Sequence, residues 1–92
     1  MDTLNHEQIE AALADLDGWG FADEAFTKTF RFADFVHAVE FVEHVAEVAE
    51  GRQHHPDIDI RFNKVTLRLT THDADGVTKR DVDLAEAVQG LL

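Results

Sequence analysis

The chain has 92 residues, no cysteine and a formal net charge of −11 at pH 7, from 19 acidic and 8 basic residues. This length suits one domain, so residues 1–92 are expected to fold as a single unit. The lack of cysteine excludes disulfides, thiolate nucleophiles and cysteine-ligated zinc sites. The negative charge argues against nucleic acid as a partner, because phosphate groups bind where the field is positive.

The N-terminal residues are polar and acidic, and no apolar run approaches the roughly 18 residues that span a bilayer. We therefore expect a cytoplasmic protein with no membrane partner. The excess of acidic residues has two explanations: an ordinary solvated surface, or adaptation to high salt, which screens the repulsion between like charges. Thermal melts across a KCl series separate the two, because a salt-adapted fold becomes more stable in molar KCl.

A first helix is predicted to start after Asn5, where Gln8 completes a capping box. Its apolar residues recur at helical spacing, and it is predicted to stop before residue 17. Residues 19–21 form a candidate edge strand. Residues 26–32 alternate phenylalanine with polar residues, which is typical of a strand.

A second helix is predicted to begin after Asp34, a residue type favoured at N-caps. It runs for roughly four turns and ends near Glu50, where Gly51 can supply a left-handed cap. Glutamates and a histidine occupy its polar side. The residues predicted to form its apolar stripe are Phe35, Val39, Val42, Ala46 and Ala49.

Two alternating segments, residues 57–62 and 65–71, are predicted to pair as a hairpin connected by residues 63–64. Thr78 and Asp81 form a second capping box, which predicts a third helix. Each predicted strand has one apolar face. The expected fold is therefore α+β: a four-stranded antiparallel sheet with three helices packed on one face.

Strict pairing outward from the predicted turn brings two distant histidines together. It places Pro56 opposite Thr71 and His55 opposite His72, so residues 17 apart in sequence become neighbours in space. His72 would end the second strand and point away from the core. His54 precedes the paired segment, and the proline can break the strand there and turn His54 inward.

Histidines in this position have three explanations. Imidazole titrates near neutral pH, so two histidines across a slot can serve as acid and base in a dehydration. Three neighbouring histidines can instead ligate zinc and leave a water in the fourth position. A histidine at a strand end can also be an ordinary surface residue. The residues alone leave these three explanations open.

Several motifs resemble one known family. The run EGRQHHP at 50–56 resembles the Glu-x-x-x-His-His-Pro motif of pterin-4a-carbinolamine dehydratases. The run THDADGVTKRD at 71–81 is similar to that family's Thr-His…Gly-x-Thr-x-x-Asp segment, and LDGW at 16–19 and FADF at 32–35 resemble two of its upstream motifs. The resemblance covers nearly the whole chain.

The resemblance implies a dehydratase that converts 4a-hydroxytetrahydropterin to quinonoid dihydropterin, with the pterin as substrate and with no cofactor and no metal. It implies that His54 and His72 are the acid/base pair, and that His55 binds substrate or shares proton transfer. The supporting positions that match the family motifs are Glu50, Pro56, Thr71 and Asp81. The acid at 81 also has a purely structural explanation as part of a capping box.

The resemblance further implies a place in tetrahydropterin recycling and leaves the identity of the pterin open. The alternative class is a non-catalytic pterin-binding or protein-interaction module, because some members of the family resemble transcriptional coactivators. A small domain with an exposed sheet edge and an apolar helix face is also expected to form a homodimer or a homotetramer.

Overall fold

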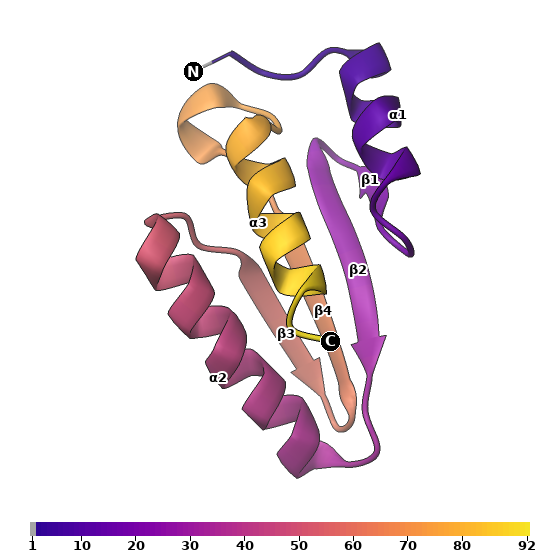
Figure 1. Ribbon diagram of the computed structural model, residues 1–92, viewed down its shortest axis with the longest axis vertical. Helices are drawn as coiled ribbons and strands as arrows, with labels where there is room; N and C mark the ends of the chain where they lie inside the picture. The colour runs from indigo at the N-terminus through magenta and orange to yellow at the C-terminus, as the bar shows by residue number, and fades with distance from the viewer. Residues whose placement is uncertain (1) are drawn as a thin grey trace.

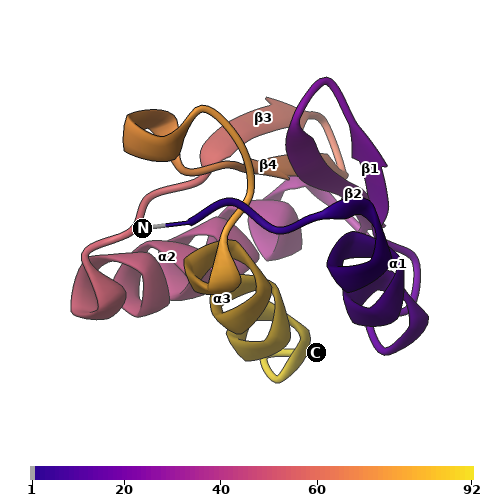
Figure 2. The same ribbon diagram turned by 90° about the horizontal axis from the view of Figure 1, so that it is seen from above.

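The computed structural model describes residues 2–92 and contains one four-stranded antiparallel sheet in the order β1-β2-β4-β3. The strands are β1 (Gly20–Ala22), β2 (Ala25–Arg31), β3 (Asp57–Arg61) and β4 (Lys64–Leu69). The helices are α1 (His6–Ala14), α2 (Phe35–Arg52) and α3 (Lys79–Gln89), with a 3₁₀ turn, η1 (His72–Ala74), before α3. Figures 1 and 2 show the three α-helices on one face of the sheet, which confirms the predicted α+β fold.

The core lies between this face of the sheet and the helices. The central strands β2 and β4 contribute the largest fully buried side chains, Phe26, Leu67 and Leu69. Leu84 and Val88 of α3 are fully buried in the same cluster. Burying a side chain of this size stabilises the fold by about 1.5–3 kcal/mol. β4, which leads the chain toward His72, is therefore anchored in the buried core.

The predicted helix starts are confirmed. Asn5 and Gln8 form a reciprocal capping box at α1, and Thr78 and Asp81 form another at α3. The Asp34 side chain accepts a hydrogen bond from a backbone N–H in the first turn of α2. These caps depend on neighbours in sequence, so local pattern was sufficient to predict them.

The apolar stripe predicted for α2 matches its buried face only in part, since Val42 packs partly buried against the core. The buried residues of the helix are Ala38, Phe41, Val45 and Ala49. Of the predicted stripe, Ala49 is buried, whereas Phe35 is 51% exposed. The Phe41 ring determines which face of α2 is turned to the sheet, because its centroid lies 4.8 Å from that of Phe30 and 4.9 Å from that of Phe32. None of the helices in residues 2–92 is long and apolar enough to cross a membrane.

α2 also ends later than predicted. It continues through Gly51 to Arg52, and the left-handed residue is Gln53, with φ 53° and ψ 40°. The Gln53 side chain compensates by donating a hydrogen bond to the Glu50 carbonyl over 2.9 Å. This cap turns the chain sharply into β3, and the two site histidines follow it directly.

The β3–β4 hairpin forms as predicted, but its register differs by two residues. Arg61 pairs with Lys64, so the two-residue turn is Phe62-Asn63. The positive φ falls on Phe62, at 54°. Asn63 instead fastens the hairpin to the preceding segment, since its side chain donates to the Phe32 carbonyl and its own carbonyl accepts from the Phe32 N–H.

The register correction changes the expected contacts of the histidines. Asp57 pairs with Arg68, and β4 ends at Leu69, so His55 and His72 are not partners across the sheet. His72 begins the 3₁₀ turn η1 instead of ending β4. Thr71 forms an isolated bridge with Gly76, and this bridge closes the loop that carries His72.

Candidate active site

His54 lies at the junction between α2 and β3. The backbone N–H of His54 donates to the Ala49 carbonyl, which holds the residue against the end of the helix. Arg80 of α3 donates to the Gln53 carbonyl over 2.6 Å and ties the same junction to the third helix. His54 is 9% exposed, so its imidazole ring is turned inward. This confirms the predicted inward turn ahead of Pro56.

The His54 ring meets a buried carboxylate. Its Nε2 atom lies 2.5 Å from Oδ1 of Asp81, which is fully buried at the start of α3. The other oxygen, Oδ2, accepts from the Thr71 hydroxyl at 2.7 Å and from the Thr78 backbone N–H at 2.9 Å. Asp81 therefore serves the capping box and the histidine at the same time.

The hydrogen bonds of this group define where its protons lie. The Thr71 hydroxyl donates to Asp81, so the Thr78 hydroxyl, 2.8 Å away, must donate to Thr71. Asp81 acts as an acceptor throughout, which places the His54 proton on Nε2. In the neutral form of the ring, the lone pair of His54 is then on Nδ1. No buried side-chain nitrogen or oxygen in residues 2–92 lacks a partner, so the network is complete.

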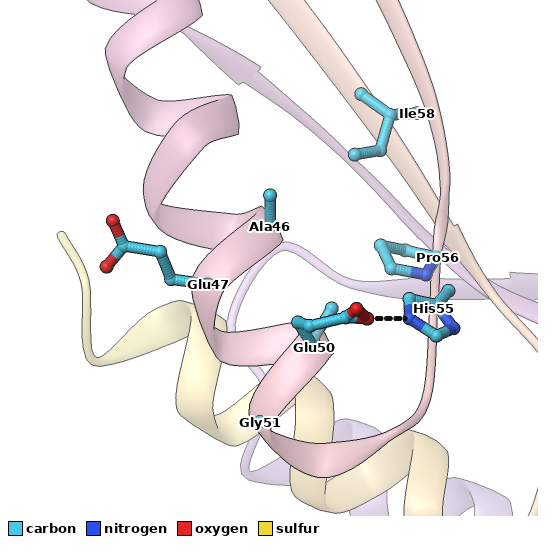
Figure 3. A pocket seen from close by; sticks show the side chains of 8 residues that line it. Ala46, Glu47, Glu50, Gly51, His55, Pro56 and Ile58 are labelled. Atoms are coloured by element: carbon cyan, nitrogen blue, oxygen red, sulfur yellow. Dashed lines mark hydrogen bonds and ion pairs between the residues drawn. The ribbon is translucent and has the colours of Figure 1, made fainter.

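His55 has the opposite environment. Its Nε2 atom lies 2.9 Å from Oε1 of Glu50, and the two side chains are 62% and 66% exposed. Figure 3 shows them facing each other at the end of α2, beside Pro56 and Ile58. These residues border a cavity of about 680 Å³ between α2 and β3, which we call the apolar groove.

His72 reaches the other histidines through a second cavity. This cavity of about 200 Å³, which we call the histidine cavity, is lined by His54, His55, His72, Thr70, Thr71 and Arg80, together with Gln53 and Asp73. The three histidines thus line one cavity, although the predicted pairing of His55 with His72 was wrong. Thr71 and Asp81 support the site from inside, Glu50 contacts its exposed histidine, and Pro56 borders the apolar groove.

Four residues that line the histidine cavity were not predicted: Gln53, Thr70, Asp73 and Arg80. Arg80 carries a detectable signal in the sequence: it lies in the first turn of α3, where a positive charge opposes the helix dipole. Its hydrogen bond to the α2 end accounts for this placement. Gln53 carries no such signal, because its role depends on where α2 ends.

Within residues 2–92, no group of three or more histidine, cysteine, aspartate or glutamate side chains is arranged to hold a metal ion. His54 directs Nε2 to Asp81 and His55 directs Nε2 to Glu50. The arrangement suits proton transfer. Around one cavity lie His54, whose tautomer is set by Asp81, His55, which is held by Glu50, and the exposed His72.

Comparison with known proteins identifies the family of the chain. Residues 2–91 match the family model described as pterin 4 alpha carbinolamine dehydratase. A protein of Mycobacterium avium (strain 104), provisionally named pterin-4-alpha-carbinolamine dehydratase, is 48% identical over 92 residues, which cover 100% of this chain and 98% of that protein. A protein of Chloroflexus aurantiacus with the same provisional name is 46% identical, with 100% and 99% covered.

A solved structure agrees with these relatives. The crystal structure described as a transcriptional coactivator/pterin dehydratase from Brucella melitensis superposes with a TM-score of 0.94 at 36% sequence identity. The match covers 98% of each chain. The chain therefore belongs to the pterin-4-alpha-carbinolamine dehydratase family.

Proposed function

We propose that this protein dehydrates 4a-hydroxytetrahydropterin to quinonoid dihydropterin, with histidines as the general acid and base and with no metal or cofactor. The observation that supports this most is the buried contact between His54 and Asp81, beside a cavity shared with His55 and His72. A buried carboxylate that fixes the tautomer of a histidine is a common way to prepare a general base.

The reaction removes one proton and one hydroxide from the substrate. His54 takes the proton from the ring nitrogen N5 with its Nδ1 lone pair, and Asp81 stabilises the imidazolium that forms. As the N5–C4a double bond forms, the C4a–O bond breaks. His72, exposed on η1, donates a proton to the leaving hydroxyl, so the product is water. His55, held by Glu50, contacts the pterin ring.

A stopped-flow assay with synthetic 4a-hydroxytetrahydropterin tests this proposal. We expect the wild-type protein to accelerate dehydration over the spontaneous reaction, and His54→Ala and His72→Ala each to lower kcat by about 10² or more. Failure of the wild-type protein to accelerate the reaction would exclude the dehydratase function. Full activity in both variants would exclude the assigned roles and leave the function standing.

We also propose that the chain self-associates through β3. All five residues of this edge strand are exposed, and Ile58 and Ile60 are 38% and 37% exposed although they are on the core face. Antiparallel pairing of two copies about Asp59 places each Asp57 opposite an Arg61 and each isoleucine opposite an isoleucine. Edge strands with unpaired backbone groups favour such pairing.

Light scattering on the Ile60→Lys variant tests self-association. Two lysines introduced near the pairing axis should convert the assembly to monomers while the fold persists by circular dichroism. Lys64→Gln, on the neighbouring strand, is the control and should keep the wild-type mass. A wild-type protein that is monomeric at 100 µM, roughly the concentration a weak dimer requires, would contradict the proposal.

A further inference from the structure

Three cavities lie in a row at the site, and two histidines separate them. His55 borders both the apolar groove and the histidine cavity. His72 and Thr70 border both the histidine cavity and a third cavity of about 330 Å³. The third cavity is also lined by Asp23, Glu24, Arg68, Asp75 and Gly76, and we call it the turn cavity. The proposed function gives the turn cavity no role.

The size of the histidine cavity indicates that the substrate extends beyond it. Sites for small molecules usually occupy about 300–1,000 Å³, and the histidine cavity has about 200 Å³. A fused two-ring pterin whose C4a lies among the three histidines must therefore enter a neighbouring cavity. The turn cavity shares His72 and Thr70 with the histidine cavity and so continues it directly.

The two neighbouring cavities differ in chemistry. The apolar groove is lined by alanines, Gly51, Pro56 and Ile58, and by Glu47, Glu50 and His55, of which Glu50 and His55 bond to each other. The turn cavity contains three carboxylates, an arginine, a threonine and His72. The pyrimidine edge of a pterin carries an N3–H and a 2-amino group side by side, and a carboxylate accepts both hydrogen bonds at once. The polar edge of the ring matches the turn cavity.

The turn that carries Asp23 and Glu24 is held toward this cavity. Both residues have positive φ, 51° and 61°, a conformation that is costly without glycine. Two side chains hold the turn in place. Arg68 of β4 donates to the Asp23 carbonyl over 2.7 Å, and Thr70, the residue after β4, donates to the Glu24 carbonyl over 2.8 Å. Thr70 thus links the turn to the wall of the histidine cavity.

Of the three acids that line the turn cavity, Glu24 is the one whose carboxylate is placed beside Gly76. Its Oε2 atom would lie 3.4 Å from a Cβ atom at Gly76, so the carboxylate lies over the loop that carries His72. Within residues 2–92 its side chain makes no hydrogen bond or ion pair, while its backbone carbonyl is fixed by Thr70. The carboxylate is therefore available, and the turn beneath it is rigid.

We propose that Glu24 is a specificity-determining residue that binds the 2-amino and N3–H groups of the pterin in the turn cavity. The proposal rests on the proposed dehydratase function for the identity of the substrate. It assigns a role to a turn that none of the sequence motifs include. It also assigns the apolar groove to the substituent carried on the other ring.

Calorimetric titration of Glu24→Gln with two ligands tests the proposal. The first ligand is 7,8-dihydropterin, and the second is its 2-oxo analogue, which offers an acceptor where the pterin offers an amine. We expect Glu24→Gln to weaken binding of the pterin about tenfold, as loss of a charged hydrogen bond does. Binding of the 2-oxo analogue should stay unchanged or improve, because the repulsion between carboxylate and carbonyl is removed.

Glu43→Gln, an exposed carboxylate in the middle of α2, is the control and should bind both ligands as the wild type does. Equal effects of Glu24→Gln on both ligands, or no effect, would overturn the proposal. The dehydration assay separates this outcome from failure of the proposed function. If the wild-type protein accelerates dehydration but Glu24→Gln keeps the wild-type preference between the two ligands, only the subsite is excluded. If Glu24→Gln changes the preference but the wild-type protein does not accelerate dehydration, only the dehydratase function is excluded.

Discussion

Two adjacent histidines of this chain have opposite surroundings. His54 is buried, and its partner Asp81 is fully buried and also bonded to Thr71 and Thr78. The neighbouring His55 pairs with Glu50 at a similar distance, but both side chains are mostly exposed. The contacts have the same chemistry. The difference in burial decides which one fixes a tautomer and stabilises the fold.

Solvent explains the difference. Water competes for every donor and acceptor of an exposed pair and screens its charges, so such pairs contribute about 0–1 kcal/mol. A buried pair has no such competitor, and removal of one partner leaves the other without compensation, at a cost of about 3–5 kcal/mol. The buried pair is therefore a structural element as well as a chemical one.

Asp81→Asn should have the largest effect. The amide can keep one oxygen toward Thr71 and the Thr78 N–H, but it then presents an N–H group to His54 Nε2. The histidine must move its proton to Nδ1 and loses the lone pair there. We expect unfolding free energy to fall by about 3 kcal/mol and kcat by about 10² or more.

Thermal melting and the stopped-flow assay measure these two effects. His54→Ala is the comparison, because it removes the base and leaves the carboxylate capped by Thr71 and Thr78. Asp81→Asn with wild-type kcat and wild-type melting temperature would show that the buried pair has neither role.

Thr71→Val should have an intermediate effect. The substitution keeps the shape of the side chain but removes the hydroxyl that donates to Asp81 and accepts from Thr78. The loss leaves buried polar groups short of a partner, so we expect about 1–3 kcal/mol of destabilisation. For a domain of this size, each kcal/mol lowers the melting temperature by roughly 4–8 °C.

Thr66→Val is the matched control, because its hydroxyl contacts that of Thr29 on the exposed face of the sheet. Valine is well tolerated in strands, so this variant should melt close to the wild type. A Thr71→Val protein that melts no lower than Thr66→Val would contradict the structural role of the network.

Glu50→Gln should have a small effect on stability, within about 0.5 kcal/mol, because the pair with His55 is exposed. If Glu50 orients His55 for substrate, KM should rise while kcat stays nearly constant. Urea unfolding and steady-state kinetics measure the two quantities. A loss of stability as large as that of Asp81→Asn would remove the distinction between the two histidines.

The smallest effect concerns a third histidine–carboxylate pair, Asp34 and His37 at the start of α2. Hydrogen bonds from the His37 backbone and side chain lower the pKa of Asp34, and the hydrogen bond to Asp34 raises the pKa of His37. Asp34 therefore stabilises the helix fully at pH values above 3.8, the ordinary pKa of this carboxyl group. It loses this effect as the pH falls through its lowered pKa. His37 stabilises the helix fully at pH values below 6.5, the ordinary pKa of this imidazole. It loses this effect as the pH rises through its raised pKa.

The pair is thus fully effective between about pH 4 and 6.5. NMR titration should show a higher His37 pKa in the wild type than in Asp34→Asn. The urea midpoint of Asp34→Asn should differ most from the wild type inside this window and least at pH 8 and above. An identical His37 titration in both proteins would show that the pair does not form in solution.

Local rules predicted much of this fold. Capping boxes, strand alternation and the helix starts depend on residues within one turn or one strand, and each was predicted from sequence. The proximity of His54, His55 and His72, which line one cavity, was also predicted, and their role as a site stays a prediction. The motif resemblance contributed more to that prediction than the register, because the predicted register was wrong by two residues.

The errors arose where tertiary contacts choose between equal local options. Both hairpin registers place Ile58 and Ile60 on the core face, so alternation could not separate them, and the positive φ on Phe62 was not expected. Two stripes of α2 satisfy helical spacing, and the contact of Phe41 with Phe30 selects one. The high-salt adaptation inferred from the charge stays a prediction.

The N-terminal segment has a consequence for how this site changes among related sequences. Leu4 donates its N–H to the Val77 carbonyl, and the Thr3 methyl group would lie 3.0 Å from a Cβ atom at Gly76. Figure 2 shows this segment passing over the start of α3. Positions 3, 24 and 76 therefore share one small volume beside His72. We expect them to covary: a larger residue at 76 requires a smaller one at 3, and shifts the acid at 24.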